Sequence, residues 1–228
     1  MIGFYDSGIG GKRIADIFAR ISTQPYICYQ DTKSLPLGDK TPEQIQDCVL
    51  AGIEHLFEQG CNLVVLACNT ASVSTIRYIQ SEWLPAHYPG KQVLGVTAPL
   101  REYLGTIPQI KLKRGLLMAT QATIETGFYQ EYLREGGYQF DTLSCPGLAE
   151  AIEYDIKNDT EFSKSRQVLQ TLSQQIQTKP DYIILACTHY GYSIELIQHI
   201  FKTKLILDPS YFIADRLVDY LKRHPEYR

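Results

Sequence analysis

The chain has 228 residues and a net charge of −3, with 44% apolar and 21% charged residues. This balance is typical of a globular protein and excludes a disordered or fibrous chain. The length fits one large domain or two small ones, either of which buries a hydrophobic core. A pI near 6 provides no basic surface for nucleic acid or membranes. No apolar run approaches the roughly 18 residues of a membrane span, and the N-terminus lacks the features of a signal peptide.

Strands and helices alternate along the chain. Short apolar runs predict strands at 2–5, 26–29, 63–67, 93–96, 115–119, 138–143, 182–186 and 205–207. Most are continuous apolar segments, which is typical of strands covered on both faces. Thr41 and Gln44 form a capping box before an amphipathic helix that ends at Gly60. Further helices are expected over 162–176 and after Asp208. The alternation predicts an α/β fold with parallel sheets.

One sequence pattern occurs twice. Residues 61–70 (CNLVVLACNT) resemble residues 181–189 (DYIILACTH), and each is an apolar strand that ends in Leu-Ala-Cys before polar residues. The two cysteines, Cys68 and Cys187, are 119 residues apart, about half the chain. We therefore predict two similar α/β halves. Each half places a cysteine at the carboxyl end of a strand, where open α/β sheets bind ligands.

The six cysteines include no C-x-x-C pair, so reduced thiols and a cytoplasmic protein are expected. Two thiols on opposite sides of a cleft suit proton removal from one face of a carbon and proton return to the other. His189, two residues after Cys187, is a candidate proton partner for that thiol. A cysteine at a strand end is more often part of the core, but the repetition favours chemistry for Cys68 and Cys187. The other four are expected to be structural. A zinc site from Cys68, Cys187 and His189 has unsuitable ligand spacing, so no metal is expected.

The first strand leads into a glycine-rich turn, Asp6 to Gly11. Exposed N–H groups at such a turn before a helix bind anions. A dinucleotide site is the obvious rival, with Asp31 at the ribose position, but Arg13 replaces the third glycine of the fingerprint and Asp6 would repel phosphate. The turn therefore suits a carboxylate. A tight turn capped by Asp6 is the alternative without a ligand.

Further polar residues stand at strand ends, and the sequence leaves their roles open. Asp31 is either a second acidic group of the site or a solvated turn residue. Thr120, Thr123 and Thr126 cap a helix or hold a carboxylate. By pattern alone, Glu153 is a surface glutamate.

Taken together, these segments resemble the glutamate racemases of the aspartate/glutamate racemase superfamily. The matching stretches are 6–11 (DSGIGG), 31–38, 67–72 (ACNTAS), 115–129, 144–153 and 186–190 (ACTHY). The resemblance implies two flavodoxin-like α/β domains related by a pseudo-twofold axis, with the active site between them. It implies a first domain of residues 1–97 plus 209–228 and a second of residues 98–208.

The same resemblance implies a cofactor-independent racemase of L- and D-glutamate, which supplies D-glutamate for peptidoglycan. Cys68 would deprotonate the D-enantiomer with help from Asp6, and Cys187 the L-enantiomer with help from His189. Asp31 and Glu153 would be further acidic groups. The expected substrate-binding residues are Ser7, Pro36, Leu37, Gly38, Asn69, Thr70, Thr120, Thr123 and Thr188. The only small-molecule partner implied is the amino-acid substrate, and a homodimer is suggested.

The chain departs from the family pattern at several positions. Leu37 stands where the family usually has tyrosine, Gly191-Tyr192 where it has Pro-Leu, and Lys12 where leucine is common. These departures bear on substrate preference and leave the thiols untouched. The alternatives are racemisation of another amino acid such as aspartate, a non-catalytic amino-acid or carboxylate binder with the same fold, and a nucleotide-binding protein.

Overall fold

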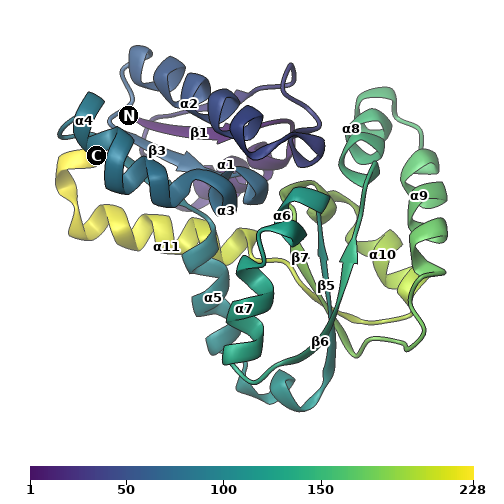
Figure 1. The fold of residues 1–228 in the computed structure, drawn as a ribbon. Coiled ribbons are helices and arrows are strands. Elements are labelled where there is room, and N and C mark those ends of the chain that lie inside the picture. Colours follow the sequence, from purple (N-terminus) through teal and green to yellow (C-terminus); the bar gives the residue numbers. More distant parts are fainter.

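The computed structural model describes residues 1–228 and contains two four-stranded parallel sheets. The first has the order β2-β1-β3-β4 and the second the order β6-β5-β7-β8 (Figure 1). The strands are β1 (Ile2–Asp6), β2 (Tyr26–Gln30), β3 (Leu63–Leu66), β4 (Gln92–Gly95), β5 (Arg114–Ala119), β6 (Gln139–Ser144), β7 (Tyr182–Ala186) and β8 (Leu205–Leu207). The identical order confirms the predicted duplication, because β3 and β7 occupy the same place in their sheets. It is also the beginning of the flavodoxin-like order.

Eleven α-helices connect and cover the strands. They are α1 (Gly10–Ile21), α2 (Pro42–Glu58), α3 (Asn69–Tyr78), α4 (Leu84–His87), α5 (Thr97–Gly105), α6 (Gln121–Glu125), α7 (Phe128–Glu135), α8 (Leu148–Asn158), α9 (Ser163–Ser173), α10 (Ile194–Phe201) and α11 (Ser210–Arg223). Short 3₁₀ segments are η1 (Leu37–Asp39), η3 (Pro108–Leu112), η4 (Thr188–Ser193) and η5 (Pro225–Tyr227), and η2 (Ile79–Trp83) is a π-helical turn.

The local signals in the sequence produce the elements they predict. All eight predicted strands form, with ends that differ by no more than one residue. The Thr41 hydroxyl accepts from the Gln44 N–H, and the Gln44 side chain accepts from the Thr41 N–H, so the capping box is confirmed. Gly60, just past α2, has φ of +86°, a conformation that glycine adopts at little cost. Helix α9 ends at Ser173, three residues earlier than expected.

Each sheet is buried on both faces, which explains the continuous apolar strands. Helices α1 and α11 cover one face of the first sheet, and α2 with α3 covers the other. Helices α8, α9 and α10 cover one face of the second sheet, and α5 with α7 covers the other. We call the first sheet with its helices the first domain and the second sheet with its helices the second domain.

The chain crosses between the domains twice. Helix α5 follows β4 of the first sheet, yet its Leu100 and Leu104 pack among buried residues of the second. Helix α11 follows β8 of the second sheet, yet its Ile213 and Leu217 pack with α1 (Figure 1). Two crossings hold the carboxyl ends of both sheets close to one another.

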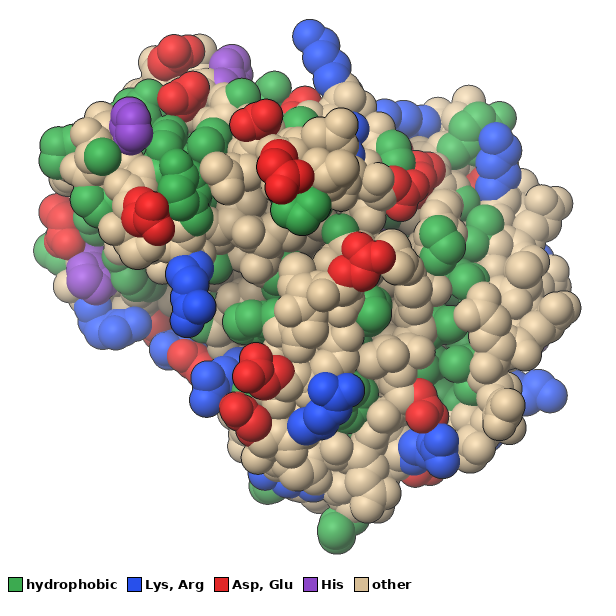
Figure 2. Space-filling model, in the orientation of Figure 1, with side chains coloured by type: hydrophobic (Ala, Val, Ile, Leu, Met, Phe, Trp, Pro, Cys, Tyr) green, Lys and Arg blue, Asp and Glu red, His purple; other side chains and the backbone are tan.

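The surface carries charges of both signs. Figure 2 shows lysine and arginine side chains interspersed with acidic ones over the visible face. None of the helices has both the length and the apolar character required to cross a bilayer.

Candidate active site

A pocket between the domains is lined by Cys68 and Cys187 together. Cys68 follows β3 and is the N-cap residue of α3, and Cys187 follows β7 at the start of η4. Both side chains are buried, with 7% and 8% exposure. The two copies of the Leu-Ala-Cys pattern therefore bring their thiols to one cavity from opposite domains.

The Cys68 thiol lies among polar groups of its own domain. Its Sγ is 3.9 Å from the Ser7 Oγ. Burial, followed by the nearby Asp6 carboxylate, raises the pKa of Cys68 to about 12, although the N–H groups of Ala71 and Thr70 act in the opposite direction. Cys68 is therefore a neutral thiol in the free protein at pH 7.

The Cys187 thiol is held neutral by similar causes. Burial raises the pKa of Cys187 well above its usual range, and the proximity of Cys68 raises it further. The backbone N–H of His189 lowers it by hydrogen bonding. Each thiol therefore has at least one N–H group of the following turn ready to stabilise a thiolate, two for Cys68 and one for Cys187.

Asp6 lies at the carboxyl end of β1, fully buried behind the pocket wall. Its Oδ1 accepts from the Gly8 N–H at 3.0 Å, and its Oδ2 accepts from the Thr188 hydroxyl at 2.9 Å. Burial raises the pKa of Asp6 even though these bonds oppose it. Asp6 thus connects the first-domain turn to Thr188, the residue that follows Cys187.

Glu153 of α8 bridges the same two parts of the site. Its Oε2 is 2.9 Å from the His189 Nε2 and accepts from the Ile9 N–H at 3.0 Å, and its Oε1 accepts from Lys157 at 2.7 Å. Burial alone would raise the pKa of Glu153, but the bonds from His189, Lys157 and Ile9 outweigh it and lower the pKa to about 2. The expectation of a surface glutamate is wrong, since the side chain is 4% exposed. The turn of the first domain covers it, and the local sequence of α8 contains no sign of that contact.

The glycines of the turn allow this close approach. A Cβ on Gly8 would collide with the Glu153 carboxylate, and one on Gly10 would collide with the Thr188 hydroxyl. The turn therefore does bind carboxylates through its N–H groups, as the sequence predicts, but these carboxylates belong to the protein. Two of its N–H groups, those of Gly8 and Ile9, bind carboxylates of the protein itself.

Hydroxyl groups of the second domain hold the two residues after Cys68. The Tyr129 hydroxyl donates to the Asn69 Oδ1 at 2.6 Å. The Thr70 hydroxyl lies 2.9 Å from that of Thr120 and 3.2 Å from that of Thr123. Asn69, Thr70 and Thr120 line the pocket, whereas Thr123 is fully buried behind it. The Asn69 amide nitrogen is left available to a ligand.

Most of the remaining predicted residues line the pocket, and one supports a loop that does so. Pro36, Leu37 and Gly38 line the pocket, as do Ser7, Thr188 and His189. Asp31 does not. Its carboxylate instead accepts from the Ser34 hydroxyl and, at 3.5 Å, from the Tyr5 hydroxyl, so it holds the loop that leads to Pro36.

The sequence did not indicate several other wall residues. These are Leu35, Asp39, Gln121, Cys145, Pro146, Gly147, Ala149 and Glu150. Cys145, expected to be structural, donates its S–H to the Leu143 carbonyl but also faces the cavity. Glu150 precedes Glu153 by three residues and so shares its helix face. All of these wall residues except Asp39 also lie within the stretches 31–38, 115–129 and 144–153 that carry the family resemblance, so that resemblance was a further signal for them. No group of three or more His, Cys, Asp or Glu side chains is arranged to hold a metal ion.

The fold and the site define a class: two-domain α/β proteins with a pair of thiols facing one interdomain pocket. No family model matches the chain. It is 34% identical to the glutamate racemase of Roseobacter denitrificans, over 100% of this chain and 87% of that protein. It is also 34% identical to that of a Jannaschia species, over 99% and 86%.

Comparison with solved structures also finds glutamate racemases. The TM-score is 0.81 with a glutamate racemase from Bacillus anthracis, at 25% identity over 98% of this chain and 82% of that one. It is 0.79 with that of Campylobacter jejuni, at 27% identity over 98% and 85%. An aspartate racemase from Picrophilus torridus, at 18% identity and a TM-score of 0.63, shares the fold. Given the near full-length curated relatives, the chain belongs to the glutamate racemase family.

Proposed function

We propose that this protein is an isomerase that interconverts L- and D-glutamate by proton transfer between the α-carbon and two thiols. The observation that carries the proposal is the meeting of Cys68 and Cys187 in one pocket from opposite domains. A substrate between them presents one face of its α-carbon to each thiol. The chemistry needs no group beyond those of the chain and the substrate.

The proton transfer proceeds in two steps, deprotonation on one face of the α-carbon and reprotonation on the other. The thiolate on one side takes the α-proton, so that a C–H bond breaks, an S–H bond forms and the electron pair remains on carbon. The opposite thiol then gives its proton to the other face and becomes the thiolate. We assign Cys68 to the D-enantiomer and Cys187 to the L-enantiomer, with Asp6 and His189 as their assistants.

The developing carbanion needs donors that are already in place. The Asn69 amide and the Thr70, Thr120 and Thr188 hydroxyls line the pocket and suit the substrate carboxylates. Glu153 holds His189, and Asp31 supports the loop that carries Pro36, Leu37 and Gly38. We regard Glu153, Asp31 and Thr123 as positioning residues for this reaction.

The domain division supports the same mechanism. We propose that residues 1–97 with 209–228 form the first unit and residues 98–208 the second, because α5 packs on the second sheet and α11 on the first. We also propose a cytoplasmic enzyme whose D-glutamate supplies peptidoglycan. The suggested homodimer stays a prediction, which light scattering of the purified protein tests.

The decisive experiment incubates the protein with L-glutamate in D₂O without added cofactor. We expect the circular dichroism of glutamate to decay while the α-proton signal in the NMR spectrum disappears. Cys68→Ala and Cys187→Ala should each lose racemisation, whereas Cys48→Ala, a partly buried cysteine outside the pocket, should retain it. Racemisation by Cys68→Ala at the wild-type rate would exclude the two-thiol assignment. Activity on aspartate alone would favour the other racemase alternative.

A further inference from the structure

The departure from the family pattern at Gly191 and Tyr192 has a structural counterpart in the first domain. The Tyr192 hydroxyl donates to the Ile9 carbonyl at 3.1 Å, across the domain boundary. The Ile9 N–H donates to Glu153, also in the second domain. The peptide groups on both sides of Ile9 are thus fixed by second-domain side chains. Ile9 lies in the glycine-rich turn that begins with Asp6 and Ser7.

Arg13 of α1 packs against the same tyrosine. Its guanidinium carbon lies 5.8 Å from the centre of the Tyr192 ring, within the range of a cation–π contact. Its Nη2 and Nε donate to the Asp208 Oδ2 at 2.7 and 3.2 Å. The other Asp208 oxygen accepts from the N–H and hydroxyl of Ser210 at the start of α11. Arg13 therefore links α1 both to Tyr192 and, through Asp208, to the segment that leads into α11.

Glycine at 191 is required for this arrangement. A Cβ at that position would lie 2.6 Å from the Arg13 Nε and 3.2 Å from the Asp208 Oδ2. Any other residue would force Arg13 off its path to Asp208. The unusual Gly191-Tyr192 pair thus has a joint physical reason, which includes Arg13.

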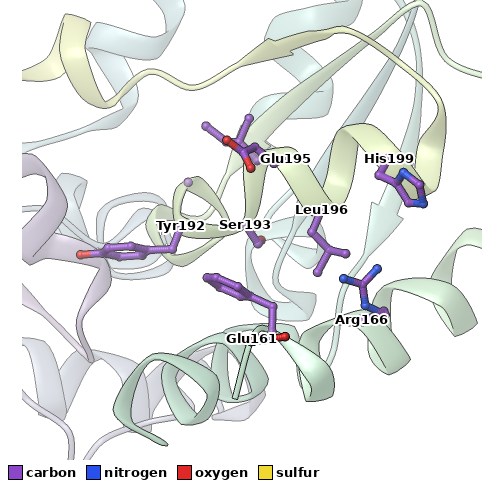
Figure 3. A pocket seen from close by; sticks show the side chains of 10 residues that line it. Glu161, Arg166, Tyr192, Ser193, Glu195, Leu196 and His199 are labelled. Carbon is purple, nitrogen blue, oxygen red and sulfur yellow. The ribbon is translucent and has the colours of Figure 1, made fainter. Parts of the chain in front are cut away.

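The orientation of Tyr192 supports a connecting role. Tyr192 forms one end of a surface cavity that Arg166 and His199 also line. In Figure 3 its ring points away from Arg166 and His199, toward the purple ribbon of the N-terminal part. Burial raises the pKa of Tyr192 to about 12, so its hydroxyl remains a donor throughout the neutral range.

We propose that Tyr192, supported by Arg13 and Gly191, is a positioning residue that fixes the Asp6–Gly11 turn against the second domain and so sets substrate affinity. The turn supplies Ser7 to the pocket wall and Asp6 to Thr188. Loss of the bond to Ile9 leaves the thiols in place but loosens the turn. The kinetic part of this inference rests on the proposed racemase function.

The first test uses Tyr192→Phe, which removes the hydroxyl and keeps the ring beneath Arg13. Amide hydrogen exchange is compared with the wild type for residues 6–13 and for α2, which is remote from the contact. We expect exchange of residues 6–13 to be at least about threefold faster and that of α2 to be unchanged. Equal protection of residues 6–13 would overturn the proposal. This readout needs no activity, so it is independent of the proposed function.

The second test measures kinetics with L-glutamate after the wild type has been shown to racemise it. We expect Tyr192→Phe to raise KM about three- to tenfold with kcat within about twofold of wild type. Tyr211→Phe is the matched control, since Tyr211 is 57% exposed and without a hydrogen bond through its hydroxyl. An unchanged KM, or a lower kcat at unchanged KM, would overturn the proposal. If the wild type is inactive, the proposed function fails and the exchange result still stands.

The third test addresses Gly191. Gly191→Ala should lower the melting temperature and raise KM, because the methyl group collides with Arg13. Arg13→Ser alone loses the bonds to Asp208, and combined with Gly191→Ala it also removes the collision, so the double variant should be destabilised by less than the sum of the two single variants. Fully additive losses of stability would refute the assigned role of glycine.

Discussion

Replacement of Glu153 by Gln tests the electrostatic core of the site. Glu153 accepts hydrogen bonds from His189, Lys157 and the Ile9 N–H, and these lower its pKa from an ordinary 4.5 to about 2. A shift of one pKa unit corresponds to about 1.4 kcal/mol, so the lowered pKa means that the ionised Glu153 carboxylate stabilises the folded protein by about 3 kcal/mol. Because the folded-state pKa is the lower one, this stability is present above pH 4.5 and is lost as the pH falls toward 2.

The assay is urea unfolding of wild type and Glu153→Gln across this pH range. We expect the variant to be less stable by about 3 kcal/mol at pH 7, since the neutral amide satisfies His189, Lys157 and Ile9 only in part. The difference should shrink steadily between pH 4.5 and pH 2, where the wild-type carboxylate also becomes neutral.

Glu150 provides the matched control on the same face of α8. Burial raises the pKa of Glu150, so its ionised form is the less favourable one in the folded protein. Glu150→Gln should therefore leave stability at pH 7 unchanged or slightly higher. The reasoning is refuted if Glu153→Gln is as stable as wild type at pH 7, or if both variants lose stability equally.

Two further predictions concern the surroundings of Cys68. Tyr129→Phe removes the hydroxyl that donates to the Asn69 amide oxygen and fixes this side chain. Loss of one hydrogen bond of about 1 kcal/mol predicts a several-fold higher KM for glutamate in steady-state assays. An unchanged KM would exclude this role for Tyr129. Asp6→Asn removes a negative charge that raises the pKa of Cys68, so iodoacetamide should modify Cys68 several-fold faster at pH 8, as measured by mass spectrometry. The rate at Cys61, whose pKa is raised by burial and not by Asp6, should stay the same, and equal rates at Cys68 would contradict the prediction.

The sequence predicts most of the fold because the signals for it are local. Strands buried on both faces are continuous apolar runs, and the Thr41 capping box predicts the residue at which α2 begins. The repeated Leu-Ala-Cys pattern predicts the pairing of Cys68 with Cys187, since equivalent strands end at equivalent edges.

The contacts between the domains could not be predicted in the same way. Glu153 has the sequence context of a surface residue, and its burial depends on Ile9 and Gly8, more than 140 residues earlier. The bond from Tyr192 to Ile9 likewise joins residues 183 positions apart. Neither contact produces a periodic pattern, because each side chain meets a backbone group of a distant segment, and the side chain at that segment leaves no trace of it.

The charge balance of the pocket bears on how the two-base reaction proposed above would begin at neutral thiols. Burial of both thiols, together with the charge of Asp6, favours the protonated forms of Cys68 and Cys187 in the free protein. An amino acid bound there as proposed would bring an ammonium group into this pocket, and a positive charge near a buried thiol lowers its pKa. The N–H groups of Thr70, Ala71 and His189 then stabilise the thiolate that forms. In the proposed reaction, substrate binding would therefore supply the charge that prepares the base, so reactive thiolates need not exist in the empty site.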